Sequence, residues 1–144
     1  MTDRDPALEP FDALIGTWAT EATHPLFEGV VPGSVTFEWV EGGHFLVQRS
    51  RSDHESFPDA ISVIGAPEAG DGLVMEYFDS RGVRRTYGVS LEDGVLRFWR
   101  DDPTFAQRSS ATVGVDGFEA RWEVAETPGT WQDDVRVVYR RRSA

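Results

Sequence analysis

The residues best suited by type to move protons are two histidines and an aspartate in the first half of the chain. His24 begins one Pro-containing stretch, and Asp53 and His54 begin another, residues 53–59. Histidine titrates near neutral pH and a neighbouring carboxylate can orient it, so these groups could act as general acid and base. Asp and Pro are also ordinary turn residues. Two interpretations of His24, Asp53 and His54 therefore stay open: acid–base catalysis at a rim, or turn structure.

A second group consists of polar side chains on strand faces that are otherwise apolar. Arg49 shares the alternating face of Phe45, and Arg100 shares that of Phe98. A buried charge is costly unless it is paired, so an inward arginine indicates a ligand carboxylate or phosphate held by the guanidinium fork. Exposure at strand ends, or pairing with acidic residues, would explain the same arginines without a ligand. The residues expected to line a ligand cavity are Arg49, Tyr77, Tyr87, Arg100, Gln107, Trp122 and Trp39.

Motifs for metal binding and covalent catalysis are missing from the sequence. His24, His44 and His54 form no closely spaced array, and the chain has no cysteine. Thiolate metal sites and a cysteine nucleophile are therefore excluded. The sequence also contains no Gly-x-Ser-x-Gly elbow, phosphate-binding glycine loop or dinucleotide fingerprint. We expect no metal site.

Strands must position these residues, because apolar and polar residues alternate with period two from Thr17 almost to the C-terminus. Asp-Gly and Gly-Gly pairs, which favour tight hairpins, separate the alternating runs. A short helix over 6–15 should precede the strands, with Pro6 in its first turn and Gly16 at its end. The expected strands are 17–24, 35–41, 45–52, 60–66, 73–79, 83–91, 95–100, 106–115, 118–125 and 133–141.

About ten antiparallel strands without a long helix predict an all-β fold, an up-and-down barrel. A flat sheet of this size would curl or split, and closure removes its edges. A β-sandwich is the main alternative. The 144 residues correspond to one domain, 1–144, with 1–15 as an N-terminal segment and helix. The loops 24–33 and 53–59 should shape the barrel entrance.

Composition narrows the class of partner. The formal net charge of −11 argues against nucleic acid and anionic membranes, which attract basic surfaces. No apolar run approaches the roughly 18 residues that a membrane helix needs. Residues 1–6 lack the basic and apolar regions of a signal peptide. We therefore expect a cytoplasmic protein whose partner is a small hydrophobic or amphipathic molecule; a homodimer is left open.

The triplet Gly16-Thr17-Trp18 resembles the Gly-x-Trp opening of the calycins, a group that includes lipocalins, fatty-acid-binding proteins and nitrobindins. Segments 33–43, 77–82 and 139–141 are similar to bacterial lipocalin-like proteins. The resemblance implies a closed barrel with a ligand in its mouth. It also implies that Trp18 plugs the closed end and stacks on a basic side chain of the last strand, for which Arg140 is the candidate.

Nitrobindin-like proteins bind haem through a histidine late in the chain, so the resemblance makes haem an alternative cofactor. This sequence departs from that pattern, because no His, Cys or Met follows Met75. Tyr139 would be the remaining candidate for an iron ligand. The function expected first is binding of a hydrophobic or amphipathic molecule, with an acidic head group, in the barrel. The alternatives are a haem protein and a barrel enzyme with a His/Asp acid–base pair at its rim.

Overall fold

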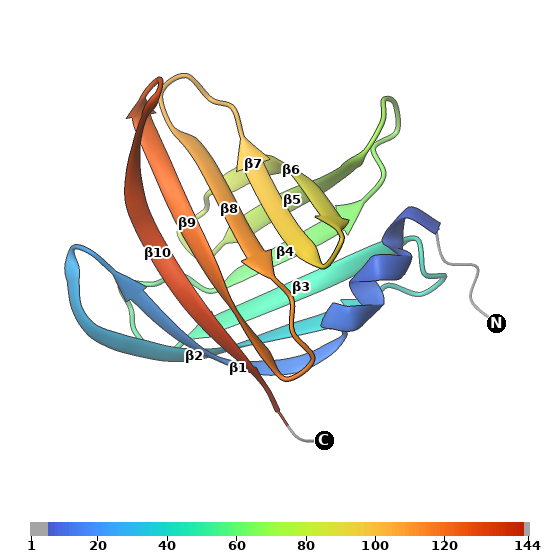
Figure 1. Ribbon diagram of the computed structural model, residues 1–144, viewed down its shortest axis with the longest axis horizontal. Coiled ribbons are helices and arrows are strands. Elements are labelled where there is room, and N and C mark those ends of the chain that lie inside the picture. The colour runs from blue at the N-terminus through green and yellow to red at the C-terminus, as the bar shows by residue number, and fades with distance from the viewer. Residues whose placement is uncertain (1–5, 143–144) are drawn as a thin grey trace.

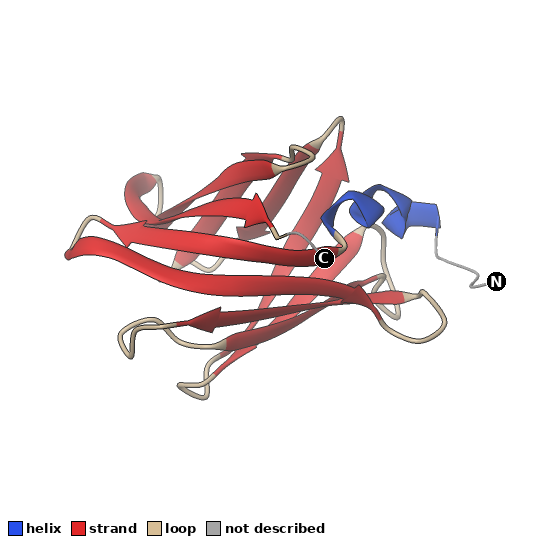
Figure 2. Ribbon diagram, turned by 90° about the horizontal axis from the view of Figure 1, so that it is seen from below, coloured by secondary structure: helices blue, strands red, loops and turns tan. Residues whose placement is uncertain are grey.

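A computed structural model describes residues 6–142 of the chain (Figure 1). Residues 1–5 and 143–144 lie outside the described residues, and with them most of the stretch used above in the signal-peptide argument. One short helix lies beside a strongly curved sheet (Figures 1 and 2). The elements are η1 (Pro6–Leu14), β1 (Gly16–His24), β2 (Phe27–Trp39), β3 (Phe45–Ser52), β4 (Ala60–Gly65), β5 (Leu73–Asp79), β6 (Arg84–Glu92), β7 (Val95–Arg100), β8 (Ala106–Thr112), β9 (Gly117–Thr127) and β10 (Thr130–Arg141).

The strands form a closed antiparallel barrel in which each strand pairs with its neighbours in the sequence. The ring closes because β1 pairs with β10 as well as with β2, which places Trp18 between Arg141 and Val35. Every strand of the described chain therefore has two partners, and the barrel has no free edge. The expected all-β, up-and-down barrel is confirmed, and a sandwich is excluded.

The second strand is much longer than expected, since β2 begins at Phe27 and the expected strand began at residue 35. Pro32 and Gly33 made this stretch resemble a loop. Pro32 pairs with Glu21 of β1, and its carbonyl accepts a hydrogen bond of 3.0 Å from the backbone N–H of Asp53. Proline removes a donor and leaves the acceptor intact, so the strand continues through it.

The N-terminal helix is a 3-10 helix that ends at Leu14, one residue earlier than expected. Its buried residues are Leu8, Phe11 and Leu14, which are spaced by three. This spacing places them on one side of a helix with three residues per turn. Pro10 inside the helix lacks the N–H that a regular α-helical ladder would use.

The main hydrophobic core fills the barrel end that η1 covers. Each of its largest side chains is fully buried. Burial of one such side chain contributes roughly 1.5–3 kcal/mol to the stability of the fold. These side chains are Trp18, Phe11, Leu8, Leu14, Leu46 and Ile64. This end of the barrel is therefore closed, and space for a ligand is left toward the opposite rim.

Trp18 holds the closed end together through its contacts with the helix and the last strand. Its indole N–H donates to the carbonyl of Leu14 at 2.9 Å, and the Arg141 guanidinium lies 4.1 Å from the ring centroid. Arg141 also donates to the carbonyls of Ile15 and Ala13, both at 2.7 Å. The prediction that Arg140 stacks on Trp18 was wrong. Arg140 is exposed, because it lies on the outer face of β10 and Arg141 lies on the inner face.

We predict that Arg141→Leu lowers the free energy of unfolding by about 2–3 kcal/mol, because it removes charged hydrogen bonds and the contact with the indole. Urea unfolding monitored by Trp fluorescence measures this change. The exposed neighbour Arg140 provides the control, and Arg140→Leu should change stability by less than about 0.5 kcal/mol. Equal effects of the two substitutions would refute the role given to Arg141.

Candidate functional site

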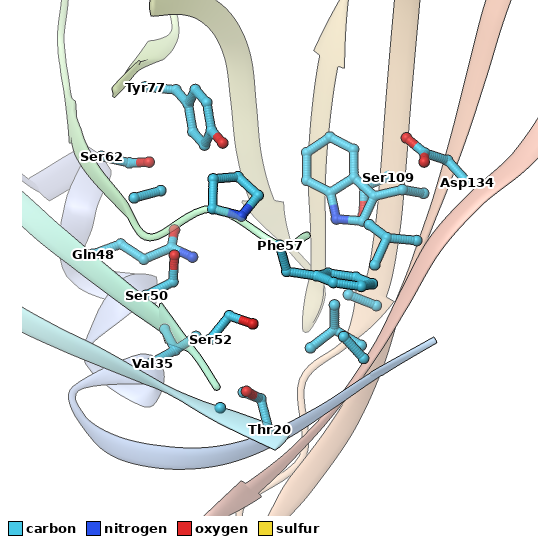
Figure 3. Close-up of a pocket in the computed structure, with 18 of the residues that line it drawn as sticks. Thr20, Val35, Gln48, Ser50, Ser52, Phe57, Ser62, Tyr77, Ser109 and Asp134 are labelled. Carbon is cyan, nitrogen blue, oxygen red and sulfur yellow. The ribbon is translucent and has the colours of Figure 1, made fainter. Parts of the chain in front are cut away.

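The barrel encloses a cavity of about 560 Å³ that extends from the core to the open rim (Figure 3). Its volume is in the range of small-molecule sites. At the rim the lining comes from the loops and strand ends opposite η1, through Leu26, Phe27, Phe57, Pro58 and Phe105. Both stretches that were expected to shape the entrance therefore contribute to it.

The cavity has one polar wall, formed by β3, β4 and β5. Gln48, Ser50 and Ser52 of β3 point inward, and Ser62 of β4 and Tyr77 of β5 follow beside them (Figure 3). The register pairs Gln48 with Ser62, and Ser62 with Tyr77, so these three side chains form one row across adjacent strands.

The remaining wall is largely apolar and comes from strands near the ring closure. Its members include Val31 and Val35 of β2, Ala120 of β9, and Val135 and Val137 of β10. A ligand in this cavity would contact hydrocarbon on one side and hydroxyl and amide groups on the other. The cavity therefore suits an amphipathic molecule better than a uniformly apolar one.

Three of the predicted residues meet in one aromatic and amide cluster that lines the cavity. The Tyr87 hydroxyl donates to Gln107 Oε1 at 2.7 Å, and both residues are buried. The Trp122 ring meets Tyr87 edge-on at 5.8 Å between centroids, and it stacks on Phe98. Burial raises the pKa of Tyr87, so its hydroxyl remains a neutral donor at physiological pH.

Tyr77, another predicted residue, belongs to a charged network near the mouth. Its hydroxyl donates to Asp79 Oδ2 at 2.7 Å, and Arg81 donates to the same oxygen at 2.7 Å. The Asp79 side chain has no exposed surface. Its desolvation opposes ionisation, but the hydrogen bonds from Arg81 and Tyr77 outweigh it and hold the pKa of Asp79 well below its usual range. Burial, aided by the bond to Asp79, raises the pKa of Tyr77.

Arg85 and Gln48 are among the lining residues that the sequence analysis missed. Arg85 lies opposite Tyr77 in the register, and its guanidinium is 5.0 Å from the ring centroid of Phe105. No carboxylate in residues 6–142 forms an ion pair with it. The signal was present in the sequence, because Arg85 shares the alternating face of Tyr87.

Three predicted lining residues lie elsewhere. Arg49 is exposed on the outside of β3 and pairs with Glu38 at 2.7 Å. Trp39 lies at the closed end, and its indole N–H donates to Asp12 at 3.4 Å. Arg100 donates to the carbonyl of Phe105 at 2.7 Å and to Asp102 at 3.2 Å, and it is not part of the cavity lining. These positions correct the expected ones.

The error at Arg49 has a clear cause in the packing of its strand. Both faces of β3 carry apolar residues, and Leu46, not Phe45, points into the core. Phe45 lies on the outside, where its ring covers Gly65 and occupies the position that a Cβ there would need. Because Gly65 has no side chain, the Phe45 ring can lie flat on the outer surface. Arg49 shares the face of Phe45, so it also points outward and not into the cavity as expected.

The three acid–base candidates do not come together. His24 lines the cavity and forms a pair with Asp134, with 3.0 Å between Nε2 and Oδ1. His54 instead contacts Phe27 through its ring, and Asp53 is exposed. Within residues 6–142 no hydrogen bond or ion pair joins the side chains of Asp53 and His54. The acid partner of a rim histidine is therefore Asp134, which lies 110 residues away and gave no local signal.

The hydrogen bonds of His24 assign the tautomer of its ring. Its Nδ1 accepts the backbone N–H of Leu26 at 3.0 Å, so Nε2 carries the proton that is donated to Asp134. Neither nitrogen has a free lone pair for a substrate proton or a metal ion. Among the described residues no group of three or more potential metal ligands is found.

The residues present do not fit haem. The ring nitrogens of His24 are both occupied, and Met75, with 3% of its surface exposed, is part of the core. Burial raises the pKa of Tyr139 to about 12, which disfavours the phenolate that would bind iron. Its ring is also packed against Phe118 at 4.4 Å between centroids. Among the described residues that line the cavity, no side chain is therefore prepared to bind iron from inside the barrel.

The sequence matches no protein-family model and no curated protein. The structure is similar to that of Rv2717c from M. tuberculosis, with a TM-score of 0.68 and 18% identity over 98% of this chain and 100% of that one. It is also similar to fatty-acid-binding protein 1 from Echinococcus granulosus, with a TM-score of 0.63 and 16% identity over 92% and 99% of the two chains.

These identities show a common fold and do not assign an activity. The fold is that of the fatty-acid-binding barrels, as the Gly-x-Trp triplet indicated, and the finer lipocalin-like family remains a prediction. In residues 6–142 no helix has the length and apolar character needed to span a bilayer.

The network around Asp79 leads to a pH-dependent prediction. Its pKa in the folded protein lies below the usual 3.8, so the carboxylate stabilises the fold at every pH above about 4. This stabilisation is lost as the pH falls through the lower, folded value. Asp79→Asn should therefore reduce stability by about 2–3 kcal/mol at pH 7, with a smaller difference from the wild type below pH 4.

Thermal unfolding of both proteins between pH 7 and pH 2.5 measures this convergence. Asp71 lies exposed in the β4–β5 turn, so Asp71→Asn serves as the control and should follow the wild type throughout. A stability difference between wild type and Asp79→Asn that does not vary with pH would contradict the prediction.

Proposed function

We propose that this chain binds an amphipathic small molecule inside the barrel, with the acid group of the ligand on Arg85. Among residues 6–142, the arginines that line the cavity are Arg51, Arg81 and Arg85. Arg51 is exposed at the rim, and Arg81 is neutralised by Asp79. The single observation that carries the proposal is that Arg85 is half-buried and has no acidic partner within residues 6–142.

A carboxylate would complete the surroundings of Arg85. A half-buried guanidinium without a counterion has lost part of its hydration. A carboxylate would replace the lost hydrogen bonds to water with two parallel hydrogen bonds of its own. The Phe105 ring, whose centroid lies 5.0 Å from the guanidinium carbon of Arg85, covers the guanidinium and limits its movement. Tyr77 lies opposite Arg85 in the register, but its hydroxyl proton is donated to Asp79, so the acid group would depend on the guanidinium of Arg85.

The apolar part of the ligand would lie along the valines and aromatic rings of the other wall. Trp122 and Phe98 offer stacked, flat surfaces, and Val135 and Val137 continue the apolar lining. Burial of hydrocarbon here contributes about 25 cal/mol per Å² of apolar surface. The named ligand of the Echinococcus granulosus neighbour, a fatty acid, has this combination of acid and tail and supports the proposal.

The proposal predicts that Arg85→Gln weakens stearate binding about 10- to 100-fold, because charge-assisted hydrogen bonds contribute about 1.5–3 kcal/mol. Binding is measured by displacement of a fluorescent fatty acid. The same substitution should weaken the binding of methyl stearate much less, because the ester lacks the negative charge.

Arg84 provides a matched control, because it adjoins Arg85 but lies exposed on the outer face of β6, beside the Phe78 ring. Arg84→Gln should bind stearate as the wild type does. The proposal fails if neither stearate nor its ester displaces the probe, or if the two arginine variants behave alike.

A further inference from the structure

The polar wall holds a second unmet hydrogen-bonding group, far from Arg85. Gln48 Oε1 is buried and has no hydrogen-bond partner in the described chain. Gln48 lines the cavity, and its amide points into it beside Ser50 and Ser62 (Figure 3). A buried amide oxygen without a partner is destabilising, and a ligand group that meets it once the amide rotates toward the cavity would remove that cost.

Gln48 belongs to a continuous row of paired residues and lies nearer its deep end than Arg85 does. Starting at Gly16 beside the helix, the row runs through Phe37, Gln48 and Ser62 to Tyr77 and Arg85. Phe37 belongs to the closed-end core, with 2% of its surface exposed, and Arg85 lies beside Phe105 at the mouth. The tilt of the strands thus makes this row climb from the core to the mouth.

The register fixes the separation of the two unmet groups. Gln48 is on β3 and Arg85 is on β6, so three strand spacings of about 4.8 Å separate them, roughly 14 Å along the wall. A ligand that meets both groups carries its second polar group well away from the acid.

A hydroxyl is the group that fits Gln48 best. An amide presents an oxygen acceptor on one side and an N–H₂ donor on the other, and rotation of the amide exchanges them. A hydroxyl both donates and accepts, so it satisfies the amide in either orientation. An ether or ketone could only accept, and would leave the oxygen unmet.

We therefore infer that the ligand is a hydroxylated aliphatic acid, with a mid-chain hydroxyl on Gln48 and its carboxylate on Arg85. This inference rests on the proposed function, because it assumes that the acid group is held by Arg85. It adds a position within the ligand: the hydroxyl is remote from the carboxylate and lies on the side that faces β3 and β4.

The test compares three acids of equal chain length: stearate, 12-hydroxystearate and 2-hydroxystearate. The wild type should bind 12-hydroxystearate about tenfold more tightly than stearate. The 2-hydroxy isomer should gain nothing, because its hydroxyl lies next to the carboxylate. Gln48→Leu should bind stearate and 12-hydroxystearate equally.

Gln132 provides a matched control for the same substitution, because it is exposed on β10. Gln132→Leu should keep the preference for the 12-hydroxy acid. Stability supplies an independent readout: without ligand, Gln48→Leu should raise the midpoint of thermal unfolding. Gln107→Leu should lower it, since Gln107 is hydrogen-bonded to Tyr87.

The outcomes separate the two proposals. If no acid binds, the proposed function fails, and this inference fails with it. If the acids bind with equal affinity and Arg85→Gln weakens them all, the acid site stands and the hydroxyl site is refuted. A preference for 12-hydroxystearate that survives in Gln48→Leu would also overturn the assignment to Gln48.

Discussion

Ring closure between β1 and β10 is the constraint on which the other features of this protein depend. Once each strand has two partners, alternate residues must point inward, and the width of the barrel exceeds what these side chains can fill. The chain closes one end by placing Trp18 under η1 and holding it with Arg141. Without that seal the lumen would be a channel open at both ends. With it, the lumen is a pocket with a floor and a mouth.

The pocket keeps polar groups where packing alone would favour apolar ones. Interior hydroxyls and amides lose hydration when a barrel folds, and each needs a partner to offset that loss. Some partners come from the protein itself, as in the Tyr87–Gln107 pair and the Tyr77–Asp79–Arg81 network. Within residues 6–142, Arg85 has no carboxylate partner and Gln48 Oε1 has no hydrogen-bond partner. Satisfied groups give the cavity its shape, and the unsatisfied ones are those that we propose a ligand completes.

Local pattern in the sequence predicted the fold well, because alternation and turn residues act over short distances. It also placed Tyr77, Tyr87, Gln107 and Trp122 on the cavity wall. It failed where the face of a strand depended on another strand, as for Phe45, whose outward position requires Gly65 on β4. Pairings between distant segments were equally hidden. Asp134 faces His24 because β10 returns to β1 at the ring closure, and nothing near either residue in the sequence reveals that contact.

The closed end of the barrel and the cavity wall have different roles, and this affects how such a chain can change during evolution. The largest fully buried side chains gather around η1, whereas Arg85, Ser62 and Gln48 belong to the cavity wall. A substitution in the wall can alter what is recognised while the sealed end continues to supply the folding energy. New specificities can therefore arise by single steps that keep the chain folded, which makes this architecture a favourable starting point for redesign of the pocket.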